Sequence, residues 1–327
     1  MNVDQETRSR LRQAFTEADC ELYRELRRLS AETGSDHLEY IFDRPRALDQ
    51  KIRRSLYVAE VVRGPTSRVL DFGSGCGFLS CVLAATGAGC VVGVEINEPR
   101  RAVAQFLAES VFCRPNVTFQ SSIQGLDTES FDAIIMANVI SHVARLPSVI
   151  EGLKSLLRPF GLLFIEDNNN ANSVFVRRRL RTRFWPGKNH DGEIVYARRR
   201  AVHIARLCPG MSQSMVDSLA RTTYGLTIPE IERFIKRWQA TGESPYSTDA
   251  LLSRAPVDPE TGQYQENAFR PSEIVSMLFN LGFAPLRSNA KHVFDYKENA
   301  WASWGFRTFP SLSLKLAPAF EVLACKK

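Results

Sequence analysis

The sequence lacks any run of about 18 apolar residues, and its first residues contain no apolar stretch like that of a signal peptide. We therefore expect no transmembrane helix and no secretory leader. The seven cysteines include no C-x-x-C pair, and their number is odd. This usage is typical of reduced proteins and argues against a disulfide framework or a structural zinc site. The sequence thus predicts a cytoplasmic protein that binds no metal.

Positive charge is concentrated in one part of the chain. The 327 residues carry a net charge of +6. Segment 171–206 holds ten basic residues against two acidic ones, so it carries +8 and the remainder is close to neutral. The basic residues of this segment are Arg177, Arg178, Arg179, Arg181, Arg183, Lys188, Arg198, Arg199, Arg200 and Arg206. The length predicts one core with a sizeable insertion.

The most informative stretch is 69–80, where an apolar strand meets a glycine-rich turn and the start of a helix. Glycine permits positive φ and lets a ligand approach the backbone closely. The free N–H groups of the following helix then lie at the carboxyl edge of the sheet, where α/β folds bind ligands. A second apolar strand ends in Glu95, 24 residues after Asp71. A carboxylate there can accept hydrogen bonds from a ribose diol, so the two strands predict a nucleoside-binding βαβ unit.

The turn has the spacing D-x-G-x-G-x-G, which differs from the dinucleotide pattern G-x-G-x-x-G. It resembles motif I of the class I S-adenosylmethionine-dependent methyltransferases of the small-molecule type, and the resemblance extends over about residues 69–167. An α/β protein whose turn binds NAD, or no ligand, is the alternative. The resemblance implies S-adenosyl-L-methionine as cofactor and S-adenosyl-L-homocysteine as product.

The same resemblance implies a set of cofactor-binding residues. Glu95 would hold the ribose hydroxyls and Ile96 would pack on adenine, while Asp71 would orient the turn or bind the amino group. Ser122 stands where the family often has an aspartate that binds adenine. The full set is Asp71, Gly73, Gly75, Gly77, Glu95, Ile96, Ser122, Ile123 and Asn138.

The alternation of strands and helices predicts a Rossmann-like α/β fold with a seven-stranded methyltransferase sheet. Expected strands cover 68–72, 90–95, 117–120, 131–136, 162–166, 284–294 and 319–325, the last two as an antiparallel hairpin, and 158–161 is a predicted turn. Residues 65–168 and 269–327 would form the core. Residues 1–64 would be a helical extension, either a lid over the pocket or a scaffold or dimer surface, so a homodimer is possible. Residues 169–268 would be a basic, mostly helical cap inserted after the fifth strand.

Three residues after the fourth and fifth strands are candidates for catalysis. His142 could accept a proton from a hydroxyl or amine, because the ordinary pKa of histidine suits that role. It could equally cap backbone groups or pack against the cofactor. Glu166 and Asp167 are rival bases at the end of the fifth strand, or caps of the helix that follows.

The arginine-rich segment bears on the methyl acceptor. Arginine binds phosphate and carboxylate groups with a planar pair of donors, so an acidic small molecule or a glycan or lipid intermediate is expected to receive the methyl group on O, N or C. RNA is the alternative, because aromatic residues lie among the arginines and can stack on bases. The sequence has neither Asn-Pro-Pro-Tyr nor a Pro-Cys nucleophile, the motifs of base-modifying enzymes.

Overall fold

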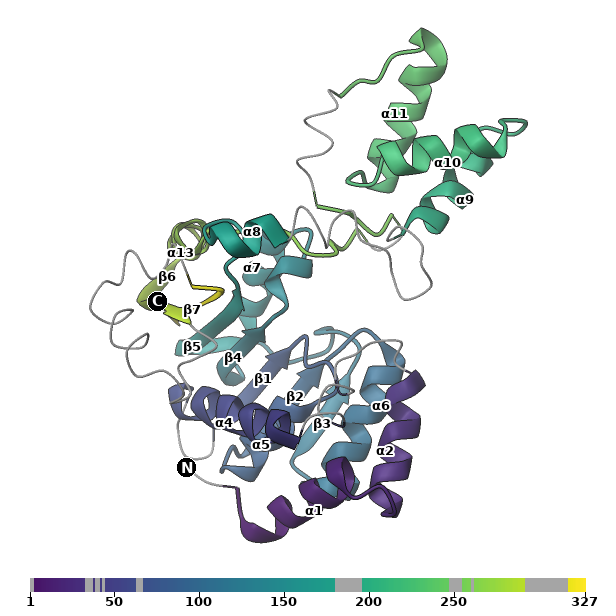
Figure 1. Cartoon of the computed structure of the whole chain (residues 1–327). Coiled ribbons are helices and arrows are strands. Elements are labelled where there is room, and N and C mark those ends of the chain that lie inside the picture. The colour runs from purple at the N-terminus through teal and green to yellow at the C-terminus, as the bar shows by residue number, and fades with distance from the viewer. Residues whose placement is uncertain are drawn as a thin grey trace.

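The computed structural model describes residues 3–32, 38, 42, 45–62, 67–179, 196–246, 255–259, 262–291 and 317–327. These residues form one seven-stranded sheet in the order β3-β2-β1-β4-β5-β7-β6 (Figure 1). The strands are β1 (Arg68–Phe72), β2 (Cys90–Val94), β3 (Val117–Gln120), β4 (Phe131–Ala137), β5 (Leu157–Asn168), β6 (Phe283–Lys291) and β7 (Ala319–Lys326). The first five pair in parallel, and β7 runs antiparallel between β5 and β6. The predicted Rossmann-like sheet with its closing hairpin is confirmed.

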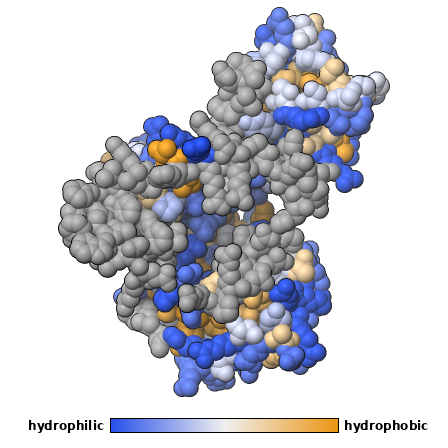
Figure 2. Space-filling view, viewed as in Figure 1, coloured by the Kyte–Doolittle hydropathy of each residue, from blue (hydrophilic) through white to orange (hydrophobic). Residues whose placement is uncertain are grey.

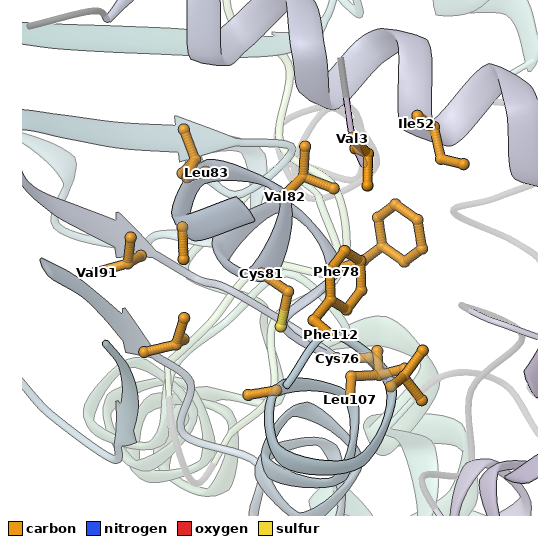
Figure 3. Close-up of a cluster of buried hydrophobic side chains, with 14 of the residues drawn as sticks. Val3, Ile52, Cys76, Phe78, Cys81, Val82, Leu83, Val91, Leu107 and Phe112 are labelled. Carbon is orange, nitrogen blue, oxygen red and sulfur yellow. The ribbon is translucent and has the colours of Figure 1, made fainter. Parts of the chain in front are cut away.

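Two separate apolar clusters cover the two faces of the sheet. The N-terminal helices α1 (Gln5–Thr16), α2 (Glu21–Glu32) and α4 (Pro45–Val61) join α5 (Phe78–Ala85) and α6 (Glu98–Phe106) on one face. Figure 3 shows part of this cluster around Phe78 of α5. Helices α7 (Leu146–Leu156) and α13 (Pro271–Asn280) cover the other face. The amphipathic pattern of the N-terminal segment thus packs on the core, with α2 against α6 and α1 against α2 and α4.

Two elements contain a local irregularity, and the second departs from the prediction. The helix after β2 continues from α6 into the π-helix η1 (Leu107–Val111), where the Phe112 N–H donates to the Leu107 carbonyl. The turn predicted at 158–161 lies inside β5, because the register with β4 jumps from Phe131–Leu157 to Ala133–Leu162. The extra residues bulge out and leave the Phe160 side chain 78% exposed.

The segment between β5 and α13 is helical where it is described. It contains α8 (Val174–Arg179), α9 (Ala197–Leu207), α10 (Gln213–Thr222) and α11 (Ile228–Thr241). Helices α9, α10 and α11 enclose an apolar cluster of their own and lie apart from the sheet in Figure 1, whereas α8 lies near α7. Hydrophilic residues cover most of the face of this helical group that Figure 2 shows. Over the described part of the chain, every helix is too short or too polar to cross a membrane.

Candidate functional site

The glycine turn connects β1 to α5, and all three of its glycines have positive φ. Two of them are required by packing within the protein. A Cβ on Gly73 would lie 2.4 Å from Val139, and one on Gly77 would lie 2.6 Å from both Ala104 and Phe119. A Cβ on Gly75 would meet no atom of the described residues within 4 Å. Gly75 is therefore the glycine whose backbone is open to a ligand.

Glu95 at the end of β2 ties the turn to the neighbouring strand. Its carboxylate is buried and accepts hydrogen bonds from the Gly75 N–H at 3.0 Å and the Asn97 N–H at 2.8 Å. A carboxylate has about four acceptor sites, so two remain for the hydroxyls of a ribose. Ile96 beside it has 59% of its surface exposed, an apolar face on which a base can stack. The Ser74 hydroxyl is buried without a hydrogen-bond partner among the described residues. These features fit the nucleoside part of the expected cofactor.

Asp71, near the end of β1, is hydrogen-bonded to the helix that follows the turn. Its buried carboxylate accepts a hydrogen bond of 2.6 Å from the Ser80 hydroxyl in the first turns of α5. Burial raises the pKa of Asp71 to about 6. This contact anchors α5 to β1.

The predicted adenine contacts lie in the loop after β3. The Ser122 hydroxyl accepts a hydrogen bond from the Gln124 N–H at 3.3 Å, and its carbonyl accepts one from Gln120 at 2.6 Å. Ile123 is half-buried and packs on the cluster that contains Ile140 and Ile150. The structure brings this loop to the same edge of the sheet as Glu95, because β3 and β2 are parallel neighbours.

Helix α4 contributes an arginine that the sequence did not single out. Arg54 Nη2 lies 2.6 Å from Glu166 Oε1. With the Asn138 amide oxygen turned toward it, Arg54 also donates to Asn138 from Nη1 at 3.2 Å and Nη2 at 3.0 Å. Arg54 thus joins the end of β4 to the end of β5. Glu166 is buried and ion-paired in this arrangement, which makes it an anchor for α4.

One turn earlier on α4, Lys51 faces the glycine turn. Its Nζ lies 5.4 Å from the centre of the Phe78 ring, and Cys76 is an electrostatic neighbour. Burial lowers the pKa of Lys51 to about 8. Lys51 and Arg54 place two basic groups beside the turn, where a carboxylate of a ligand would find them.

The second half of the site is built on the end of β5 and the 3-10 helix η2 (Ile140–His142). Asp167 is buried, and its carboxylate accepts from the Ser141 N–H at 3.0 Å, the Ser141 hydroxyl at 3.1 Å and the Asn168 N–H at 2.7 Å. Burial raises the pKa of Asp167 to about 6, and the charge of Glu266 acts in the same direction. These bonds orient the backbone on which His142 lies.

Residues 262–270, the return segment, lead from the helical insertion back to α13 and pair with η2. The Tyr264 N–H donates to the His142 carbonyl at 3.0 Å, and the Asn267 N–H donates to the Ser141 carbonyl at 2.7 Å. His142 Nδ1 lies 3.2 Å from the Tyr264 carbonyl oxygen. Glu266 Oε2 lies 4.0 Å from His142 Nε2. The return segment therefore lies against the histidine, a role for which the sequence holds no signal.

The basic segment is divided by the structure into exposed and buried arginines. Arg177 and Arg178 on α8 are exposed, as are Arg198 and Arg206 on α9. Arg200 is fully buried and donates to the carbonyls of Ala220 at 2.9 Å, Tyr224 at 3.2 Å and Val257 at 3.1 Å. Arg199 is ion-paired with Asp258 at 2.6 Å. Arg181, Arg183, Lys188 and the Arg179 side chain lie outside the described residues. Arg200 thus binds backbone carbonyls inside the helical insertion, and its side chain does not face solvent.

Residues 64–200 match the family model of a methyltransferase domain. The ubiquinone biosynthesis O-methyltransferase of Glaesserella parasuis is 35% identical over 115 residues, which cover 33% of this chain and 48% of that protein. The enzyme of the same name from Pelagibacter ubique is 25% identical over 181 residues, 52% of this chain and 75% of that protein. The chain spans about half the length of the first of these curated relatives. A solved structure of an S-adenosylmethionine dependent methyltransferase from Mesorhizobium loti aligns with a TM-score of 0.45 at 15% identity, over 83% of this chain and 96% of that one.

Proposed function

We propose that this chain, whose core is a class I S-adenosylmethionine-dependent methyltransferase domain, transfers a methyl group to a hydroxyl oxygen of a small molecule. The observation that carries the proposal is the open backbone at Gly75, held against the Glu95 carboxylate at the edge of the sheet. The O-methyltransferase names of the two relatives favour oxygen as the acceptor atom.

The residues present fit the cofactor. Glu95 would accept the ribose hydroxyls, Ile96 would cover adenine, and Lys51 and Arg54 would attract the carboxylate of the methionine part. When bound, S-adenosylmethionine supplies an electrophilic methyl group, and the electron pair of the broken carbon–sulfur bond goes to sulfur to give S-adenosylhomocysteine. The protein aligns the acceptor oxygen with this methyl group and excludes water.

His142 is the group that would take the proton of the acceptor. It is 44% exposed, whereas Glu166 is ion-paired with Arg54 and Asp167 is buried against Ser141. The imidazole is thus the accessible one of the three candidate bases. We place the acceptor between His142 and the glycine turn.

Helix α8, which begins six residues after the end of β5, supports the proposal that the acceptor carries an acidic group. Arg177 and Arg178 are exposed there. They could bind a carboxylate or phosphate on the part of the acceptor remote from the hydroxyl.

Calorimetry with S-adenosylmethionine and S-adenosylhomocysteine tests the cofactor, and transfer of a labelled methyl group tests the acceptor. Gly75→Val should abolish cofactor binding, whereas Gly210→Val should not, since Gly210 has the same open space and positive φ in the turn between α9 and α10. Absence of binding by the unaltered chain would refute the proposal.

A neutral catechol, a dihydroxybenzoate and a short RNA serve as trial acceptors. Reversing the charges of Arg177 and Arg178 should reduce kcat/KM about tenfold for the benzoate and leave the catechol unaffected. Arg198→Glu on α9 is the matched control. Methylation of the RNA alone would favour the nucleic-acid alternative.

A further inference from the structure

We infer that Glu266, in the return segment, is a positioning residue that holds the His142 imidazole ready to accept a proton. The inference rests on the proposed function, and it assigns part of the reaction site to the insertion. Glu266 is 98 residues beyond the end of β5, yet the pairing of the return segment with η2 brings it to the histidine.

The Tyr264 carbonyl determines which ring nitrogen carries the proton. A carbonyl oxygen can only accept a hydrogen bond, so the contact of 3.2 Å with His142 Nδ1 requires a proton on Nδ1. In the neutral ring, Nε2 then has its lone pair free to act as a base. The Tyr264 N–H, which donates to the His142 carbonyl, fixes the backbone on the same side.

The Glu266 carboxylate lies where it can stabilise the charged ring. At 4.0 Å, Oε2 is too far from Nε2 for a direct hydrogen bond, but it is near enough to stabilise a positive charge on the ring. The other oxygen, Oε1, accepts from the side-chain amides of Asn168 at 3.0 Å and Asn170 at 2.7 Å. Asn168 and Asn170, which follow Asp167 at the end of β5, thus fix the Glu266 carboxylate.

Two acidic groups among the described residues act on the histidine. Asp167 on β5 is buried, and its oxygens are bonded to Ser141 and Asn168. Glu266 on the return segment is 17% exposed, and its Oε2 lies 4.0 Å from Nε2, the nitrogen proposed as the base. Glu266 is therefore the carboxylate that meets the side of the ring where the acceptor would bind.

His142 acts as the base in the proposed transfer. The acceptor O–H bond breaks and its proton passes to His142 Nε2, while the oxygen electron pair forms the bond to the methyl carbon. The donor sulfur loses its positive charge, and a positive charge appears on the imidazolium beside Glu266. The imidazolium returns the proton to solvent after product release, and the neutral ring is restored.

Nitrogen NMR of the histidine-labelled full-length protein tests this without a substrate, with His142→Gln used to assign the resonance. The unaltered protein should show a proton on Nδ1. Glu266→Gln should move the midpoint of the ring titration to lower pH, because a negative charge near the imidazolium is lost. Glu273→Gln on α13, an exposed acid of the same region, should leave the titration unchanged. An unchanged midpoint in Glu266→Gln, or a proton on Nε2 of the neutral ring, would overturn the inference.

The pH profile of methyl transfer gives a second readout. The acid limb of kcat should move to lower pH in Glu266→Gln and return most of the way in Glu266→Asp, with KM for the cofactor unchanged. A loss of rate without any displacement of the limb would mean that Glu266 only supports the fold. Loss of cofactor binding in the unaltered chain would instead refute the proposed function, and it would leave the NMR result intact.

Discussion

Glu166 and Glu321 are cross-strand partners in the antiparallel pair of β5 and β7, and both carboxylates are buried. Each is neutralised from a different element. Arg54 of α4 binds Glu166 at 2.6 Å, and Arg287 of β6 binds Glu321 at 3.1 Å. Tyr57, one turn after Arg54, donates to Glu321 at 2.6 Å, and burial together with that carboxylate raises the pKa of Tyr57. The N-terminal extension is thus fastened to the carboxyl edge of the sheet by polar contacts, as well as to its face by apolar ones.

Replacing Arg54 by Met should destabilise the protein by about 2 kcal/mol. The change leaves Glu166 buried without its ion pair, and the cost is below that of a fully buried pair because Arg54 is 33% exposed. Urea unfolding measures the effect. Arg53→Met, at an exposed neighbouring position on α4, should change stability by less than about 0.5 kcal/mol.

A double variant separates the ion pair from general damage to α4. Arg54→Met combined with Glu166→Gln should recover part of the lost stability, since the buried charge is gone. Strict additivity of the two single changes would show that Arg54 and Glu166 do not interact in solution.

Gly75 and Gly77 differ in the space around them, and this difference gives a second prediction. Gly77→Ala should lower the free energy of unfolding by about 2–4 kcal/mol, because the new methyl group overlaps Ala104 and Phe119 at a positive φ. Gly75→Ala should cost about 1 kcal/mol, from the backbone alone. Thermal and urea unfolding of both variants distinguish the two sites. Phe119→Leu should relieve part of the Gly77→Ala loss, and equal destabilisation at both glycines would contradict the packing argument.

The sheet was predictable because its strands are short apolar runs with turn residues between them. The glycine turn was predictable because the spacing of its glycines is visible within a few residues of sequence. The role of Arg54 was not predictable, because nothing in the sequence of α4 indicates which of its many charged residues binds Glu166. Glu266 lies outside every predicted strand and helix, and only the pairing of residues 264 and 267 with η2 brings it to His142. Such contacts depend on tertiary geometry, which periodicity does not encode.

The burial of Arg200 was not predictable from the sequence either, and it supplies a third prediction. Three consecutive arginines follow Ala197 in the first turn of α9, and nothing in the sequence indicates that the third is buried. Arg200→Met would leave the carbonyls of Ala220, Tyr224 and Val257 without their donor, at a cost of about 2–4 kcal/mol. The loss should be confined to α9, α10 and α11, because these helices have their own apolar cluster.

Hydrogen exchange would locate that effect. Amides of α9–α11 should exchange faster in Arg200→Met, while those of β1, β4 and β5 keep their protection. Arg198→Met, at an exposed position two residues earlier, is the control. Equal loss of protection in the sheet would mean that the helical group and the core unfold together.

Asp71 should make stability depend on pH in the acidic range. Its folded-state pKa of about 6 lies above the ordinary value of 3.8, so the folded protein holds a proton that the unfolded chain has already lost. Its favourable contribution is complete below pH 4 and is lost as the pH rises through 6, a change of about 3 kcal/mol. Asp71→Asn keeps an acceptor for Ser80 and has no such titration. The stability of Asp71→Asn relative to the unaltered protein should therefore improve between pH 4 and pH 7 in urea unfolding. Ser80→Ala, which removes a bond that lowers the pKa of Asp71, should extend the transition to higher pH. A stability difference between Asp71→Asn and the unaltered protein that stays constant over this range would show that Asp71 is ionised in the folded state throughout.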